Sequence, residues 1–241
     1  MDLDKDFEDD YFTTKYGRMH YRHHDGPGKK VIFIHGFAVG MKSWSKMVHY
    51  LPGSLDVFAI DLLGHGLSDA PDIEYSVSMH YDTLLEFVRN NLDSNPVLFG
   101  HSYGGWLAAY YSVHNKVEGL VIEDTVGLPE IVEERERVNP TFKKDMIKNA
   151  LTMNPREHVL ESMFHANNKV AFLTPRELGR INCRTLIIWG AGDKTVDTKY
   201  SKIFNSQIKK SRLEIIEDAK HTPHYSNPEQ VAKIFLDFIK Q

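Results

Sequence analysis

The chain has 241 residues, of which 41% are hydrophobic and 26% charged, with a formal net charge of −4. This is the composition of an ordinary globular protein, and the slight acidity excludes the basic surface typical of nucleic-acid binding. No apolar run is long enough for a membrane span, and the acidic first residues do not read as a secretory signal. The single cysteine, Cys183, excludes an internal disulfide and favours a reducing, cytoplasmic location.

Short apolar segments alternate with helical ones along most of the chain. Strands are expected at 18–23, 31–35, 57–61, 96–100, 118–124, 185–190 and 213–218. Several of these are continuous apolar runs, which is typical of parallel strands covered by helices on both faces. Apolar residues at helical spacing mark 81–92 and, after Pro228, 231–239. The alternation predicts an α/β fold with a mostly parallel sheet wrapped in helices.

The segment 127–180 interrupts this alternation, because it contains helical patterns and no strand candidate. About three helices are expected there, and their apolar residues, among them Met146, Met163 and Phe164, need a surface to cover. A helical cap over the site is the favoured interpretation, and extra helices packed on the sheet edge are the alternative. The chain then divides into a first core part at 1–126, a cap insertion at 127–180 and a second core part at 181–241.

One serine lies between glycines at the end of an apolar run. Gly100, Ser102 and Gly104 form a G-x-S-x-G pattern between a strand candidate and a helix candidate, which is the context of a nucleophile elbow. A sharp strand-to-helix turn crowds the backbone at 100 and 104, where a Cβ atom would clash. Ser102 is therefore the candidate nucleophile, and the alternative is a small polar residue in an ordinary turn.

A serine hydroxyl needs a base, and the base needs a carboxylate that orients it. His221 follows the last strand candidate and precedes the C-terminal helix, which places it at the same sheet edge as Ser102. Asp193 follows the strand at 185–190 and reaches that edge as well. His224 and Asp124 are the rival base and the rival acid. The order Ser102, Asp193, His221 is that of one class of hydrolase.

Chemistry at a carbonyl group also needs donors for the developing oxyanion. The loop after the strand at 31–35 would face the elbow, so we expect the backbone N–H groups of Phe37 and Tyr103 to form the oxyanion hole. Gly36 would allow close backbone approach. His35 would hold the loop as a buried structural histidine.

Five short motifs occur in a fixed order: H-G-F at 35–37, D-L-L-G-H-G-L-S at 61–68, G-H-S-Y-G-G at 100–105, W-G-A-G-D at 189–193, and His221 followed by N-P-E at 227–229. Together they resemble the α/β-hydrolase fold superfamily. The resemblance implies a sheet of about eight strands, a cap inserted after the sixth, and a Ser–His–Asp triad that uses no metal and no organic cofactor. It also implies that the motif at 61–68 is mainly architectural, so Asp61 and His65 receive no catalytic role.

Two positions depart from the family pattern. Lys220 stands where a glycine usually precedes the histidine, and Cys183 with Arg184 stands where a proline usually precedes the strand. Serine at 102 disfavours the members that use an aspartate nucleophile. Members that cleave carbon–carbon bonds of ring-cleavage products remain compatible.

These features predict a serine hydrolase that cleaves small to medium apolar carboxylic esters through an acyl-enzyme. The residues expected to contact the substrate are Gly36, Met146, Met163, Phe164 and Val196. The alternatives are the same triad acting on a carbon–carbon bond, an amide or a thioester, or a ligand-binding protein without catalysis. The histidines at 20–24 could suggest a metal site, but alternate side chains of that strand are expected to face water, so no metal is predicted.

Overall fold

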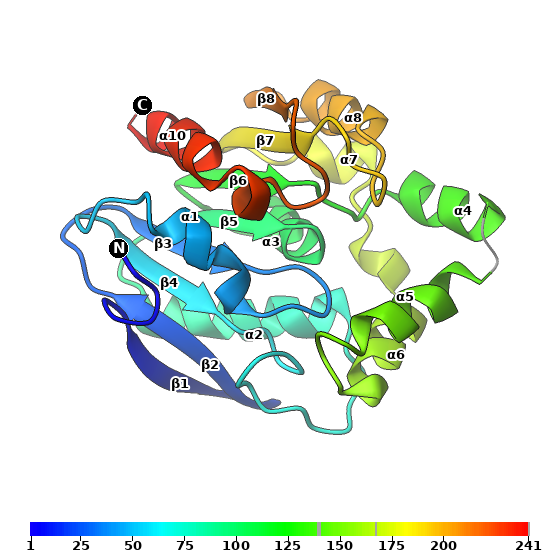
Figure 1. The fold of residues 1–241 in the computed structure, drawn as a ribbon, viewed down its shortest axis with the longest axis horizontal. Coiled ribbons are helices and arrows are strands. Elements are labelled where there is room, and N and C mark those ends of the chain that lie inside the picture. Colours follow the sequence, from blue (N-terminus) through cyan, green and yellow to red (C-terminus); the bar gives the residue numbers. More distant parts are fainter. Residues whose placement is uncertain (139–140, 167, 241) are drawn as a thin grey trace.

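The computed structural model describes residues 1–138, 141–166 and 168–240. Within them one sheet has the strand order β1-β2-β4-β3-β5-β6-β7-β8 (Figure 1). The strands are β1 (Glu8–Thr14), β2 (Gly17–His24), β3 (Lys30–Ile34), β4 (Asp56–Ile60), β5 (Val97–His101), β6 (Gly119–Glu123), β7 (Arg184–Gly190) and β8 (Ser211–Ile216). β1 and β2 pair antiparallel with each other, as do β2 and β4, whereas the pairs from β4 to β8 are parallel. The predicted mostly parallel α/β sheet is confirmed.

Strand β1 is the one that the apolar pattern did not predict. It lies at the edge of the sheet with one neighbour, and most of its side chains are exposed. Such a strand does not need an apolar face. Polar contacts attach it to β2 instead, since Asp9 Oδ1 accepts hydrogen bonds from Arg22 Nε and His20 Nε2, both at 2.8 Å.

The water-facing alternation expected for 20–24 is wrong. His20 and Tyr21 are both buried, and Tyr21 packs against Phe58 of β4 and Phe87 of the helix at 77–91. The His20 ring lies between the carboxylates of Asp9 and Asp61, and these contacts raise its pKa against the opposing effect of burial. The histidines of this strand therefore serve the packing of the sheet.

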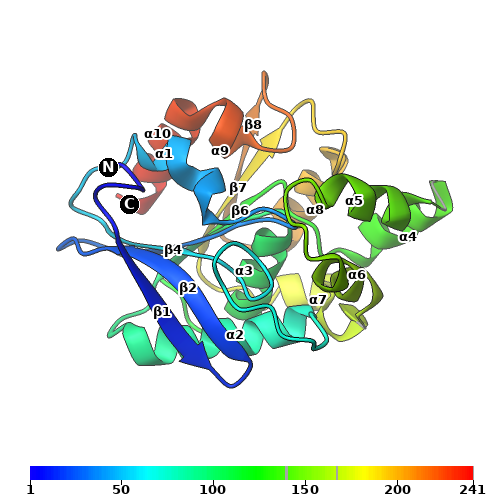
Figure 2. The same cartoon turned by 60° about the horizontal axis from the view of Figure 1, so that its bottom comes forward.

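Helices cover both faces of the sheet (Figure 2). They are η1 (Met41–Trp44), α1 (Ser45–Val48), α2 (Val77–Asn91), α3 (Tyr103–His114), α8 (Lys199–Gln207), α9 (Pro223–Ser226) and α10 (Pro228–Ile239). On one face, Trp44 and Phe235 pack against Phe33 and Phe99 of the central strands, in a core shared by α1 and α10. On the other face, α2, α3 and α8 pack on the alternate strand residues. Each central strand is therefore buried on both sides, as its continuous apolar sequence requires.

The chain between β6 and β7 forms helices rather than strands. These are α4 (Pro129–Val138), α5 (Phe142–Ala150), α6 (Glu157–His165), η2 (Asn168–Ala171) and α7 (Pro175–Leu178). In Figure 1, α4, α5 and α6 lie to the right of the sheet, on the side toward which the parallel strands point. The insertion is tied to the core by Trp106 Nε1, which donates to Ala171 O at 2.7 Å, and by Ser162 Oγ, which accepts from Tyr75 N at 2.8 Å. Its role as a cap stays a prediction.

The described part of the chain contains no helix that is long and apolar enough to cross a lipid bilayer.

Candidate active site

Ser102 lies in a sharp turn between β5 and α3. Its backbone has φ 53° and ψ −112°, a conformation that L-residues rarely adopt outside such turns. A Cβ atom at Gly100 would stand 2.2 Å from Gly104 O, and one at Gly104 would stand 2.3 Å from Ile34 O. Glycine is therefore required at both positions. The turn also places the N-terminal, positive end of the α3 dipole at the serine.

The structure brings Ser102, His221 and Asp193 together from three separate segments. His221 Nε2 lies 3.1 Å from Ser102 Oγ, and His221 Nδ1 lies 2.8 Å from Asp193 Oδ2. A carboxylate only accepts hydrogen bonds, so Nδ1 carries the proton and Nε2 presents its lone pair to the serine hydroxyl. This is the arrangement in which an imidazole can take the serine proton. We call these three side chains the triad.

Backbone amides hold Asp193 in place. Its Oδ1 accepts from Thr195 N at 2.7 Å and from Val196 N at 3.0 Å, and its side chain has no exposed surface. Val196 in turn is fixed by Trp189 Nε1, which donates to Val196 O at 3.0 Å. The loop after β7 thus presents one carboxylate oxygen to its own amides and the other to the imidazole.

The expected oxyanion loop lies directly against the nucleophile. A Cβ atom at Gly36 would stand 3.2 Å from Ser102 Cβ, so the backbone there approaches the serine closely. His35 accepts from Leu62 N through Nε2 and therefore donates from Nδ1 to Gly36 O at 2.8 Å. In a trans peptide the C=O and N–H groups point in opposite directions, so this hydrogen bond turns the Phe37 N–H away from the His35 ring.

Tyr103 is the first residue of α3, where helical N–H groups lack intrahelical partners. Its side chain points elsewhere, since the hydroxyl lies 2.9 Å from the buried His80 Nδ1. The backbone of Tyr103 is thus available beside the elbow while its ring belongs to the core.

The rival base His224 is bound to a different partner. Its backbone N–H donates to Glu123 Oε1 at 2.6 Å, and its ring Nδ1 lies 2.7 Å from Glu123 Oε2, with both side chains almost fully buried. Trp44 packs over the His224 ring with centroids 4.2 Å apart. His224 therefore anchors the loop that carries His221.

The rival acid Asp124 lies behind the triad. It is fully buried, has φ 43°, and accepts a hydrogen bond from Gly190 N at 2.9 Å. Burial, together with the charges of Glu123 and Asp193, raises its pKa well above the ordinary value. Asp193, and not Asp124, makes the hydrogen bond to His221.

Two neighbours of the triad were not singled out from the sequence. His101 Nε2 lies 2.7 Å from the carbonyl oxygen of His221, and burial holds the pKa of His101 well below its usual value. A neutral His101 thus donates to the main chain of His221. Glu123, described above, is the other. The sequence did contain a signal for Glu123, because it is an acidic residue at the end of an apolar strand. A carboxylate buried there needs a hydrogen-bond partner.

The residues predicted to contact substrate occupy three kinds of position. Phe164 of α6 packs edge-on against Phe37, with ring centroids 4.9 Å apart. Met146 on α5 is half-buried, whereas Met163 and Val196 are buried in the main core. Val196 contributes its amide to Asp193, as described above. Phe164 therefore lies against the expected oxyanion loop, and contact of these side chains with substrate stays a prediction.

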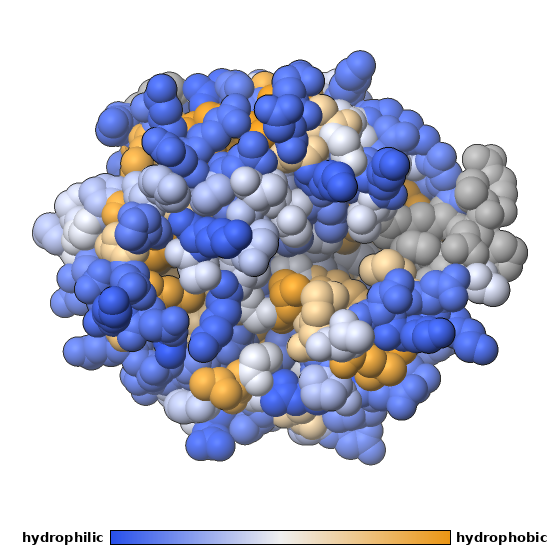
Figure 3. Space-filling view, viewed as in Figure 1, coloured by the Kyte–Doolittle hydropathy of each residue, from blue (hydrophilic) through white to orange (hydrophobic). Residues whose placement is uncertain are grey.

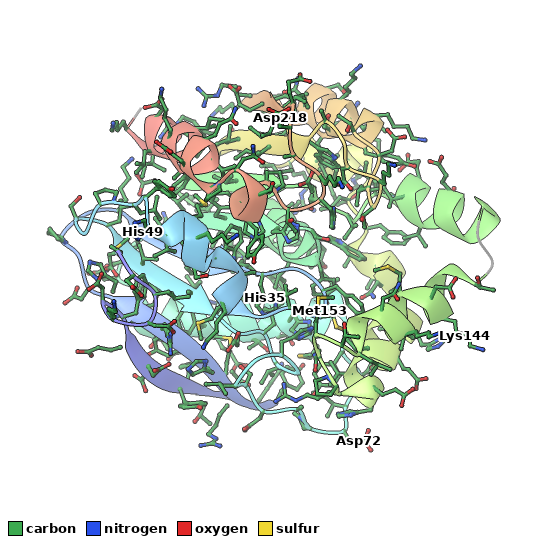
Figure 4. All side chains as sticks on the ribbon, in the orientation of Figure 1. His35, His49, Asp72, Lys144, Met153 and Asp218 are labelled. Carbon is green, nitrogen blue, oxygen red and sulfur yellow. The ribbon has the colours of Figure 1, made fainter. Side chains whose placement is uncertain are left out.

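A groove of about 280 Å³ runs between the oxyanion loop and the insertion. Its walls are Ala38, Val39, Gly40 and Gly66 from the core and Met153, Asn154, Pro155 and Arg156 from the insertion. In Figure 3 apolar residues gather near the centre of the surface, where Figure 4 labels Met153 in the same orientation.

Two groups of potential metal ligands occur among the described residues. One consists of His101, Asp124 and His221 around the triad, and the other of His23, Asp25 and Asp56. In the second group Asp56 already contacts His23 Nε2 at 2.7 Å and Lys30 Nζ at 2.5 Å. Cys183 is half-buried, and burial raises the pKa of its thiol, which disfavours a reactive thiolate.

Fold and site together define a hydrolase scaffold with a serine, a histidine and an aspartate at one sheet edge. The chain belongs to the alpha/beta hydrolase family, whose model matches residues 31–234. It is 26% identical to a 2-hydroxy-6-oxo-6-(2'-aminophenyl)hexa-2,4-dienoic acid hydrolase of Metapseudomonas resinovorans, over 90% of this chain and 86% of that protein. It is 23% identical to a monoacylglycerol lipase of Bos taurus, over 88% of this chain and 76% of that protein.

Solved structures show the same architecture. A serine hydrolase involved in carbazole degradation superposes with a TM-score of 0.81 at 25% identity, covering 97% of this chain and 99% of that one. A bacterial membrane phospholipase A superposes with a TM-score of 0.83 at 20% identity, covering 98% of this chain and 86% of that one. The predicted family and fold are confirmed.

Proposed function

We propose that this protein is a serine hydrolase that cleaves carboxylic esters through an acyl-enzyme formed on Ser102. The observation that carries the proposal is the triad, with hydrogen-bond distances of 3.1 and 2.8 Å on a strained elbow. An intact triad also argues against a purely ligand-binding role for the scaffold. Membership of a hydrolase family supports the same conclusion.

In the proposed reaction Ser102 Oγ attacks the ester carbonyl carbon while His221 Nε2 takes the hydroxyl proton. The resulting imidazolium faces the Asp193 carboxylate, which stabilises its charge. The oxyanion is bound by the N–H groups of Phe37 and Tyr103. The imidazolium then gives its proton to the leaving alcohol, and the acyl group stays on Ser102. Water, deprotonated by His221, hydrolyses the acyl-enzyme and restores the serine.

The acyl or alcohol group of the substrate is expected to be apolar and of small to medium size. Phe37 and Phe164 form an aromatic wall, and Ile147 of α5 and Leu151, which follows α5, belong to the same apolar cluster as Phe37. The cytoplasmic location inferred from the single cysteine stays part of this proposal.

Labelling with a fluorophosphonate probe tests the nucleophile. We expect the wild-type chain to be labelled and Ser102→Ala to be unlabelled, with a loss of ester hydrolysis of at least about 10⁴-fold. Ser112→Ala is the matched control, because Ser112 is a buried serine of α3 whose Oγ bonds Ala108 O at 2.8 Å. Equal labelling of Ser102→Ala would show that another residue reacts.

Cleavage of a carbon–carbon bond by the same triad is the second candidate. It is favoured by the likeness to the dienoic acid hydrolase at 26% identity. A panel with p-nitrophenyl esters of increasing acyl length, an amide, a thioester and a ring-cleavage dienoic acid distinguishes the two. We expect the highest kcat/KM on short-to-medium esters, and a preference for the dienoic acid would replace the esterase assignment.

A further inference from the structure

Asp124 is a buried carboxyl group that the proposed reaction does not use. Its Oδ1 accepts from Gly190 N at 2.9 Å. Within the described residues no donor reaches its Oδ2, although this atom is fully buried. A buried carboxylate oxygen without a donor is costly, so the state of this group needs an explanation.

The charged groups around Asp124 all disfavour an ionised carboxylate. Asp193 is its neighbour through Gly190, since Asp193 N donates to Gly190 O at 3.2 Å and Gly190 N donates to Asp124 Oδ1 at 2.9 Å. Burial, with the charges of Glu123 and Asp193, raises the pKa of Asp124. One ring nitrogen of His101 and one of His221 lie within 4.8 Å of an Asp124 carboxylate oxygen, but His101 is held neutral by burial. Neighbouring carboxyl groups away from water do not both ionise, so Asp124 and Asp193 hold one proton between them.

Hydrogen bonding decides which of the two carries that proton. Asp193 accepts from three donors, namely Thr195 N, Val196 N and His221 Nδ1. Asp124 accepts from one, Gly190 N. Donors stabilise the ionised form, so Asp193 is the carboxylate and the hydrogen resides on Asp124. The atom left to carry it is Oδ2, the one that no donor reaches.

We propose that Asp124 is a neutral carboxylic acid whose Oδ2–H donates to the Asp193 carboxylate, which makes Asp124 a positioning residue of the triad. The hydrogen bond fills a remaining acceptor position of Asp193 and fixes its orientation toward His221. The negative charge that faces the imidazole is then held by Asp193. This inference rests on the proposed serine-hydrolase function.

Two substitutions at 124 separate this proposal from an ionised Asp124. Asp124→Asn keeps the side-chain shape, tolerates the left-handed backbone, and can accept from Gly190 while its amide donates to Asp193, but it cannot ionise. Asp124→Ala removes both hydrogen bonds. We expect Asp124→Asn to keep the wild-type kcat and pH profile on p-nitrophenyl butyrate, and Asp124→Ala to lose ~10- to 100-fold in kcat with KM nearly unchanged.

An Asp124→Asn variant as impaired as Asp124→Ala would overturn the proposal, because it would show that the charge at 124 matters. A change of KM alone in Asp124→Ala, with kcat as in the wild type, would also overturn it. Asp72→Asn is the control for loss of one carboxyl group, since Asp72 is exposed. It should match the wild type in every assay.

Infrared spectroscopy tests the protonation state without any reaction. At neutral pH we expect the carbonyl band of a protonated carboxylic acid in the wild type and in Asp72→Asn, and its loss in Asp124→Asn. A spectrum in which Asp124→Asn loses no such band would refute the neutral acid, even if Asp124→Ala fails to fold. If the wild type is not labelled by fluorophosphonate, the serine-hydrolase proposal fails, whereas the infrared result stands independently.

Discussion

Replacing Glu123 with alanine removes both acceptors from His224, and we expect it to destabilise the protein strongly. The two hydrogen bonds are 2.6 and 2.7 Å long, and the side chains of Glu123 and His224 are 0% and 1% exposed. Breaking a buried pair by removing one partner costs about 3–5 kcal/mol, because the other partner stays buried without compensation. At 2–4 °C per kcal/mol, the melting temperature should fall by roughly 10 °C.

Urea unfolding measures this cost, and a second glutamate provides the control. Glu118 forms a partly exposed ion pair with Lys29 at 2.6 Å, with both side chains 36% exposed. Glu118→Ala should cost at most about 1 kcal/mol in the free energy of unfolding, as solvent-exposed pairs do. The difference between the two alanine variants then reports the burial of the Glu123–His224 pair.

A double-mutant cycle isolates the pair itself. If the two side chains interact as described, Glu123→Ala combined with His224→Ala should destabilise less than the sum of the single variants, by about 2 kcal/mol or more. Additive effects, or a cost below about 1 kcal/mol for Glu123→Ala, would refute the reasoning, since a buried carboxylate and imidazole in contact cannot be both independent and unimportant.

Two further predictions concern the elbow and the buried histidines. Gly104→Ala should cost about 3 kcal/mol or more, because its Cβ meets backbone oxygen at 2.3 Å. Gly53→Ala, whose Cβ has no neighbour closer than 3.7 Å, should be nearly neutral in the same melting assay. Burial lowers the pKa of His80 to about 4, so the unfolded chain binds a proton there at pH 5.5 that the folded chain does not. The contribution of neutral His80 to the free energy of unfolding is fully present well above pH 6.5. At pH 5.5 the free energy of unfolding should be lower by about 1.4 kcal/mol. His80→Gln should therefore reduce the pH dependence of urea unfolding between pH 7.5 and 5.5 by that amount, and an unchanged slope would contradict the assignment.

The strands of the central sheet were predictable from the sequence for a physical reason. A strand covered on both faces needs apolar side chains at every position, and 31–34, 57–60 and 97–99 all meet that demand. β1 has a single neighbour and is held by Asp9 through Arg22 and His20, so its sequence carries polar contacts rather than an apolar pattern. Pairing partners of this kind depend on register, which the sequence of one strand does not reveal.

The candidate site was accessible to sequence reasoning where position along a strand decides proximity. Ser102, Asp193 and His221 each follow a strand, and the ends of parallel strands meet at one edge. Glu123 lies on the same edge but was not predicted, because its function depends on contact with His224, about which local sequence says nothing.

Lys220 needed no special conformation, since the non-glycine residues with positive φ in the described chain are Ala38, Ser102 and Asp124.

Strand β6 supplies no member of the triad, yet its last residue, Glu123, contacts Ser102 and the loop that carries His221. β6 lies between β5, which ends at Ser102, and β7, which leads to Asp193, so these ends are separated by about 9–10 Å. Glu123 O accepts from Ser102 N at 2.8 Å, while the Glu123 side chain holds His224 in the loop of His221. The imidazole of His221 bridges the gap above β6 with hydrogen bonds at both ends.

Asp124, which follows the last residue of β6, lies beneath this bridge, with a carboxylate oxygen within 4.8 Å of a ring nitrogen of His221. A large side chain at 124 would displace the imidazole, and a second full negative charge there would compete with Asp193 for its Nδ1–H. A small group that accepts from Gly190 N and donates to Asp193 meets both requirements, and asparagine and a protonated aspartic acid are the side chains of that shape. The tolerance of Asn and Asp for a positive φ, here 43°, points to the same two residues.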